Sequence, residues 1–296
     1  MDQPLRKAVS FGPLTPELSP EVALRLIVAI CHDDLLKHRL VVLGSRRAEG
    51  IHQTRVALRR LRAALTLFRH AIGDERHHQE MRALSEQAKW LASECAPSRD
   101  LHVFLTETVD GLSGALRRIA NRLARAHLER ARAALASARF DGFVHELAAF
   151  IEAPSSPPTG RLDDFGRAVL EQRHHKVIRR GRKLHSFDPE RLHRLRIAIK
   201  KLRYAADFLR PAFASRAAKP YIQATTRLQG ALGALNDRAV AEQMIADLAA
   251  EARPTENVAR DLRKLARQAA TGEKRRRRRL ERAWKKFKNA ERFWRA

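Results

Sequence analysis

Apolar residues recur along most of the chain at intervals of three and four positions, with polar residues between them. This spacing places apolar side chains on one face of an α-helix, whereas the alternation typical of β-strands is nearly absent. The sequence therefore predicts an all-α fold. The predicted helices cover approximately residues 20–43, 48–72, 75–95, 162–180, 188–210, 218–233, 236–250 and 255–296, with further helical pattern over 99–151.

Local signals set several of these boundaries. Ser19 and Pro20 provide an N-cap and a first-turn proline, so we expect a helix that begins there and ends at Gly44. Pro97 is expected to end the third helix. The helical pattern stops at residues 153–160, which read APSSPPTG, and then starts again.

This break predicts the organisation of the chain. We expect an N-terminal extension over residues 1–19, a first helical bundle over 20–152, a linker over 153–160 and a second bundle over 161–296. The length of 296 residues is enough for two joined halves with a substantial core.

The two halves share a repeat. Residues 51–68 align with residues 192–209 without gaps once His52 is placed on His193. A second match places residues 89–103 on 226–240. An internal duplication of this kind predicts two antiparallel four-helix bundles related by a pseudo-twofold axis, with the histidine-bearing helices at the shared centre.

The repeated helix is amphipathic and carries a cationic stripe. Four basic positions of each copy fall within about 80° of one another at 100° per residue, opposite an apolar face. The stripe is about 15 Å long at the helical rise per residue. It consists of His52, Arg55, Arg59 and Arg62 in the first copy, and His193, Arg196, Lys200 and Arg203 in the second. A linear chain of phosphates fits such a stripe better than one small anion does.

The overall charge agrees with a polyanionic partner. The chain has 59 Lys and Arg against 33 Asp and Glu, which gives a net charge of +26, and a surface this positive attracts anions. A single basic helix face is usually solvated surface, but solubility does not require the same residues at the same helical phase twice. Non-specific nucleic-acid binding is the alternative, because phosphate backbones carry similar charge, although no nucleic-acid-reading motif is visible.

The sequences HQTRVALRRLR at residues 52–62 and HRLRIAIKKLR at 193–203, followed in the two halves by RD and ND, resemble the CHAD family, the conserved histidine α-helical domain. The resemblance implies two four-helix bundles around a basic central channel that binds inorganic polyphosphate. The binding residues it implies are His52, Arg55, Arg59, Arg60, Arg62, His193, Arg196, Lys200, Lys201 and Arg203. One departure is Ala96 before the first RD motif, where the second copy has Gly233.

Three further basic residues recur at helical spacing in the helix before the second histidine helix. Arg173, Lys176 and Arg180 could line the same channel or form an exposed face, and the sequence favours neither. Asp100 and Asp237 more plausibly orient arginines or cap helices than act as catalytic acids.

No cofactor, metal or catalytic centre is expected. The adjacent pair His174–His175 points to different sides of a helix, HExxH is absent, and carboxylates that could hold Mg²⁺ do not occur on the basic stripes. We therefore expect a binding protein that is not an enzyme.

Two remaining features bear on packing and location. In the basic C-terminal segment Leu280, Trp284, Phe287 and Trp294 share a helical face, which favours a packed final helix over a nucleic-acid or membrane-binding tail. Cys31 and Cys95 lie in apolar pattern and read as reduced core residues.

With no long apolar run we expect a cytoplasmic protein, and the resemblance suggests association with polyphosphate granules.

Overall fold

The computed structural model describes residues 14–45, 48–69, 71–72, 75–108, 114–154, 160–251 and 255–295. Within these ranges the fold is all-α, as predicted, and contains no strand. Most of the expected N-terminal extension, residues 1–13, and the middle of the expected linker, residues 155–159, lie outside the described residues. The helices are α1 (Pro20–Gly44), α2 (Ala48–Phe68), α3 (Glu75–Thr108), α4 (Gly114–Leu135), α5 (Ala138–Glu152), α6 (Leu162–Gly181), α7 (Pro189–Leu209), α8 (Ala218–Glu251), α9 (Glu256–Ala270) and α10 (Glu273–Lys288), with short 3₁₀ turns at Leu184–Ser186 and Arg210–Ala212.

Two helix starts show the expected capping. The Oγ atom of Ser19 accepts a hydrogen bond from the backbone N–H of Val22 over 3.3 Å, directly before Pro20 at the start of α1. At the start of α7 the carboxylate of Asp188 accepts from the N–H of Arg191 over 2.7 Å. Each bond satisfies an N–H group that has no partner within its own helix.

Four predicted boundaries are wrong. The second helix ends at Phe68 instead of Ile72. Helix α3 continues through Pro97 to Thr108, because Leu91 and Leu101 are buried on either side of the proline, and this packing outweighs one lost backbone bond. Helix α8 likewise continues through Gly233, where a glycine costs only about 1 kcal/mol. The last predicted helix is instead two, α9 and α10, separated at Gly272, whose φ of 80° lies in the left-handed region.

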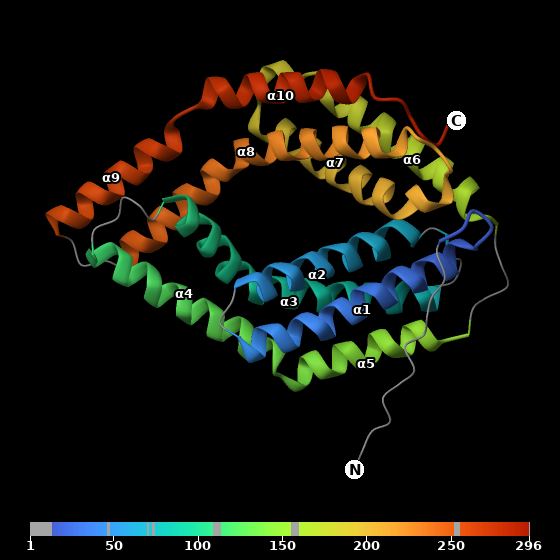
Figure 1. Ribbon diagram of the computed structural model, residues 1–296, viewed down its shortest axis with the longest axis horizontal. Helices are drawn as coiled ribbons and strands as arrows, with labels where there is room; N and C mark the ends of the chain where they lie inside the picture. Colours follow the sequence, from blue (N-terminus) through green and yellow to red (C-terminus); the bar gives the residue numbers. More distant parts are fainter. Residues whose placement is uncertain are drawn as a thin grey trace, which may run out of the picture.

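Two pairs of helices at repeated positions have the same length. Helices α2 and α7 each have 21 residues, and α3 and α8 each have 34. In the first half α1 packs against α2 and α5, and α3 packs against α2 and α5. In the second half α7 packs against α6 and α8, and α10 packs against α8 (Figure 1). This repetition agrees with the predicted twofold relation, which stays a prediction.

Two of the contact regions between the halves bear on the site. Helices α2 and α7 contact each other in the middle of the molecule, and one continuous apolar core extends through both halves. At the end of the molecule on the left of Figure 1, helices α3, α4, α8 and α9 converge on a small second core. Its buried members are Leu101, Phe104, Leu116, Ala120, Leu248 and Leu265. Contacts at both places hold α2 and α7 in a fixed relation.

Helix α10 packs its aromatic face into the second half, as the sequence favoured. Leu280 and Phe287 are fully buried, and Trp284 is buried to a slightly smaller extent. Trp294 is also buried, but it follows the end of α10 at Lys288, so the prediction that it shares the face of one helix is wrong. The ring of Trp284 lies so close to the backbone of Gly181 on α6 that a Cβ atom there would overlap it. Glycine is therefore needed at this crossing.

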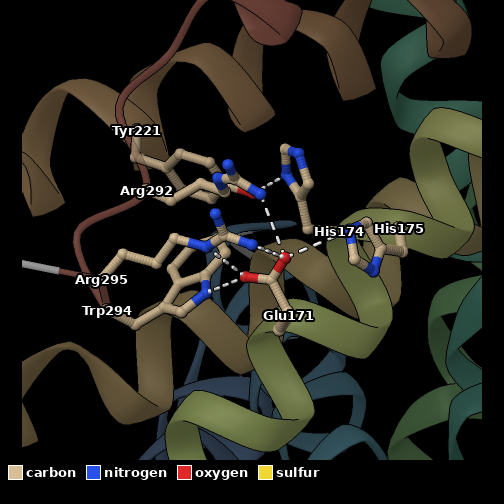
Figure 2. A network of polar contacts seen from close by, with 7 residues as sticks. All are labelled: Glu171, His174, His175, Tyr221, Arg292, Trp294 and Arg295. Carbon is tan, nitrogen blue, oxygen red and sulfur yellow. Dashed lines mark hydrogen bonds and ion pairs between the residues drawn. The ribbon is translucent and has the colours of Figure 1, made fainter.

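The chain after α10 is held by one carboxylate (Figure 2). Glu171 of α6 accepts hydrogen bonds from Arg292 over 3.0 Å and from the indole N–H of Trp294 over 2.8 Å. Arg295 donates two more, over 2.9 and 2.6 Å. These partners hold the pKa of Glu171 down at about 2 against the opposing effect of burial. The carboxylate therefore stays ionised and fixes the C-terminal segment to α6.

Candidate functional site

Helix α2 buries one face and presents basic residues on the other. Leu58, Leu61 and Phe68 are completely buried in the core, whereas Arg59 and Arg62 remain partly exposed. The amphipathic pattern therefore fixes the rotation of the helix and turns these two arginines toward the second half.

Helix α7 does the same from the other side. Leu195, Ile199 and Leu202 are buried, and Lys200 and Lys201 are exposed. Because α7 packs directly against α2, the basic faces of the two helices approach each other.

A groove of about 220 Å³ lies where α2, α6 and α7 meet. We call it the central groove. It is lined by Arg59, Arg62, Ala63, Thr66, Arg173, Ile197, Lys200, Lys201 and Tyr204. Five of these nine residues are cationic and none is acidic, so the groove suits an anion.

The two stripes act electrostatically on the same point. The pKa of Lys200 is lowered, first by loss of solvation and then by repulsion from Arg59, Arg196, Arg62 and Arg203. Two of these arginines come from α2 and two from α7. Their charges are concentrated in a partly desolvated space, where an anion would relieve the repulsion.

Residues of α6 extend the basic region on one side. Burial lowers the pKa of Lys201, and so does repulsion from Arg173, Lys176 and Arg180. Of these three, Arg173 lines the central groove, where it donates to the carbonyl of Lys201 over 2.6 Å, and burial lowers its pKa to about 10. Arg180 donates to the carbonyl of Arg194 over 2.8 Å.

Lys176 is placed differently from Arg173. Its side chain is exposed and does not line the central groove. The sequence left open whether the basic residues of α6 line the channel or form an exposed face. The position of Arg173 agrees with the first alternative, and that of Lys176 agrees with the second.

Two further basic residues, Arg203 and Arg60, do not line the central groove and lie among other partners. Arg203 donates to Asp207 over 2.6 Å and to Gln229 over 2.8 Å. The guanidinium of Arg60 lies 5.5 Å from the centroid of the Phe208 ring. These residues already have protein partners, so an anion would compete for them.

His52 and Arg55 turn toward α3. The Nε atom of Arg99 donates to Nδ1 of His52 over 3.0 Å, and Arg55 donates to the carbonyl of Ala92 over 3.1 Å, with its Nη2 atom 3.7 Å from Asp100. The pKa of His52 is lowered, first by burial and then by the charge of Arg99. His52 is therefore a neutral acceptor here.

The second copy of this arrangement differs. The side chains of Asp237 and Arg238 lie outside the part of the chain whose side chains are described. His193 is exposed and, together with Arg196, lines a second pocket between α7, α8 and α10. The stripe residues of α7 are thus divided between two pockets.

Sequence reasoning missed two sets of residues. Tyr204 accepts a hydrogen bond from Arg59. In the repeat it aligns with Ala63 of the first copy, and this mismatch was the only sign in the sequence of its role. Arg276 and Arg277 line the pocket of His193, but nothing in the basic run around them distinguishes the pocket-facing members.

Features of metal sites and membrane spans are considered together with the two cysteines. No group of three or more potential metal ligands occurs among the residues whose positions are described. No helix in the same ranges is long and apolar enough to cross a membrane. Cys31 and Cys95 are buried free thiols, as predicted, and burial raises the pKa of each to about 12.

The chain is similar to known proteins over most of its length. Residues 26–246 match the sequence model of the CHAD domain. Among solved structures, the crystal structure of the CHAD domain from the plant Ricinus communis shares 24% identity over 95% of each chain, with a TM-score of 0.80. PptA from Streptomyces chartreusis shares 16% identity over 93% of this chain and 99% of its own, with a TM-score of 0.58. At these identities both likenesses concern the fold alone, and no curated protein sequence matches the chain.

Proposed function

Because this chain belongs to the CHAD domain family, we propose that it binds inorganic polyphosphate in the central groove. The observation that carries the proposal is the position of Lys200 of α7. This lysine interacts with Arg59 and Arg62 from α2 and with Arg196 and Arg203 from α7. A multivalent anion is the ligand that would satisfy cations from both halves at once.

The groove favours a linear ligand over a single ion. Its cations follow the axes of α2 and α7, which carry stripes about 15 Å long. Charge-assisted hydrogen bonds to phosphate oxygens contribute roughly 1.5–3 kcal/mol each where water is excluded. The planar guanidinium of Arg also suits two-point contact with phosphate.

A matched pair of double variants tests the site. Arg59→Ala with Lys200→Ala removes one arginine and one lysine from the central groove, whereas Arg76→Ala with Lys89→Ala removes the same two residue types from the exposed surface of α3. The groove variant should lose at least tenfold in affinity for long-chain polyphosphate. Equal effects of the two double variants would place binding outside the groove.

We further propose that binding occurs without catalysis. Phosphoryl transfer with Mg²⁺ uses carboxylates that hold the metal, and the residues lining the central groove include none. Polyphosphate incubated with the protein and Mg²⁺ should keep its chain length on a gel. Shortening that requires the protein would show that it is an enzyme.

A cellular role at polyphosphate granules follows from the same proposal. A fluorescently tagged copy should gather at the granules, whereas the groove double variant should be dispersed at equal expression. Wild-type protein that stays dispersed in cells containing granules would contradict this role.

Non-specific nucleic-acid binding is the second candidate. It is favoured by four basic residues that lie together on the surface of α9. None of them lines the central groove. They are Arg260, Arg263, Lys264 and Arg267. Their substitution should reduce DNA binding and leave polyphosphate binding unchanged if the two ligands use separate surfaces.

A further inference from the structure

The second pocket of the molecule lies between the start of α7, the middle of α8 and the start of α10, with a volume of about 330 Å³. We call it the α10 pocket. It is lined by Phe187, Pro189, Leu192, His193, Arg196, Leu232, Leu235, Glu273, Arg276 and Arg277. Its size falls within the range of pockets that hold small molecules.

Half of the wall is apolar. Leu192 and Leu235 are partly exposed, and Leu232 is buried. Polyphosphate has no apolar part, so it would gain nothing from this surface. A ligand with an apolar ring would gain by removing both the ring and the leucines from water.

The other half is mainly cationic. His193 and Arg196 come from α7, and Arg276 comes from α10. Among the lining residues whose side chains the structure describes, the one acid is Glu273, which is paired with Arg277. The guanidinium of Arg277 also lies 4.5 Å from the centroid of the Phe187 ring. This pair adds a planar cationic surface to the pocket, of the kind on which nucleobases stack.

The cationic half continues toward the central groove. Arg196 lines the α10 pocket and also lowers the pKa of Lys200, which lines the central groove. A phosphate tail that leaves the apolar half of the pocket would therefore meet positive charge along α7. The best match to the whole lining is an anion whose phosphates are attached to an apolar ring.

We propose that the α10 pocket binds a nucleoside triphosphate. The base lies against Leu192 and Leu235, and the phosphates lie against His193, Arg196 and Arg276. This site takes a different ligand from the central groove and has a different lining, although the two adjoin at Arg196. Its α10 residues also lie outside residues 26–246, the part of the chain that matches the family model, so the pocket depends on a segment that the match does not cover.

The decisive comparison uses the groove double variant Arg59→Ala with Lys200→Ala, whose central groove no longer competes for inorganic phosphate chains. Its binding of ATP and of inorganic tripolyphosphate is measured by titration calorimetry at equal ionic strength. Free tripolyphosphate carries at least as much negative charge as ATP, so electrostatics alone would favour it. The apolar half of the pocket should reverse this order and make ATP bind about tenfold more tightly. Binding of ATP that is no tighter than that of tripolyphosphate would overturn the proposal.

Variants locate the site. Leu192→Gln with Leu235→Gln should weaken ATP to the level of tripolyphosphate, and Arg276→Ala should weaken both ligands. Arg278→Ala, which removes the same charge from an exposed position of α10, is the control and should change neither. ATP affinity that survives the leucine changes would place ATP elsewhere and reject the pocket.

The same variants separate this proposal from the polyphosphate proposal. Arg59→Ala with Lys200→Ala should weaken binding of long polyphosphate at least tenfold and retain most ATP binding. The leucine variant should retain long polyphosphate. Failure of ATP binding with intact polyphosphate binding would reject only the α10 pocket, and the opposite result would reject only the central groove.

Discussion

The Nε atom of Arg59 on α2 donates a hydrogen bond to the Oη atom of Tyr204 on α7 over 3.4 Å. Both residues line the central groove, and each comes from a different half of the chain. The bond therefore fixes the direction of one groove arginine relative to the cations of the other helix. Tyr204 is a positioning residue in this account.

Tyr204→Phe should weaken polyphosphate binding severalfold, because a hydrogen bond of this kind contributes about 1 kcal/mol, and the melting temperature should change little. In a background that already carries Arg59→Ala, the same change should have no further effect, since the two residues act through one contact. Affinities from titration of the four proteins give the comparison. Additive losses would contradict the positioning role.

Gly181→Ala should destabilise the fold by at least 2 kcal/mol, because the new methyl group would overlap the ring of Trp284 and force α10 away from α6. Gly142→Ala is the control, since the structure has nothing within 4 Å of the added Cβ atom there. Alanine within helix α5 should stabilise by about 1 kcal/mol. Urea unfolding measures the free energies of both variants. Equal effects would contradict the close contact between Trp284 of α10 and Gly181 of α6.

Glu171→Gln should destabilise the protein by about 1–3 kcal/mol, because it leaves Arg292 and Arg295 without the carboxylate that accepts their hydrogen bonds. Glu146→Gln, at an exposed position of α5, is the matched change and should have almost no effect. Denaturant unfolding compares the free energies. A loss no greater than that of the control would show that the C-terminal contacts contribute little.

Acid should destabilise the protein partly through His174. Burial is the main cause that lowers the pKa of this residue to about 4. The unfolded chain therefore takes up a proton near pH 6.5 that the folded protein takes up only near pH 4, so stability falls as the pH drops. The loss from His174 is on the order of 2 kcal/mol by pH 5. Glu171, with a lowered pKa, contributes stability that is lost only below about pH 4.5.

His174→Gln removes this titration and keeps a polar group near the Tyr221 hydroxyl, which lies 2.9 Å from Nδ1 of His174. Unfolding free energies at pH 7.5 and pH 5 should differ less in the variant than in the wild type. The same pH dependence in both proteins would assign the acid sensitivity to other groups.

The sequence was sufficient for the all-α fold and for the faces of α2 and α7, because burial follows the apolar period directly. It failed at Pro97 and Gly233, where long-range packing outweighs a local helix-breaking signal. Helix boundaries depend on such contacts, which periodicity does not contain.

The site was predictable in part for the same reason. The helical phase placed Arg59, Arg62 and Lys200 on surfaces that meet. Periodicity could not predict that the ring of His52 accepts a hydrogen bond from Arg99 of another helix. It also could not predict that His193 lines a different pocket. These positions depend on how α3 and α10 pack against the repeated helices.

The central claim is that the groove selects inorganic polyphosphate over other polyanions. Its most direct test is a titration of the wild-type protein with long-chain polyphosphate and with duplex DNA, at equal phosphate concentration and physiological salt, where non-specific electrostatic binding is weakened. We predict that polyphosphate binds more tightly and that Arg59→Ala with Lys200→Ala removes the difference. Tighter binding of DNA would contradict the claim.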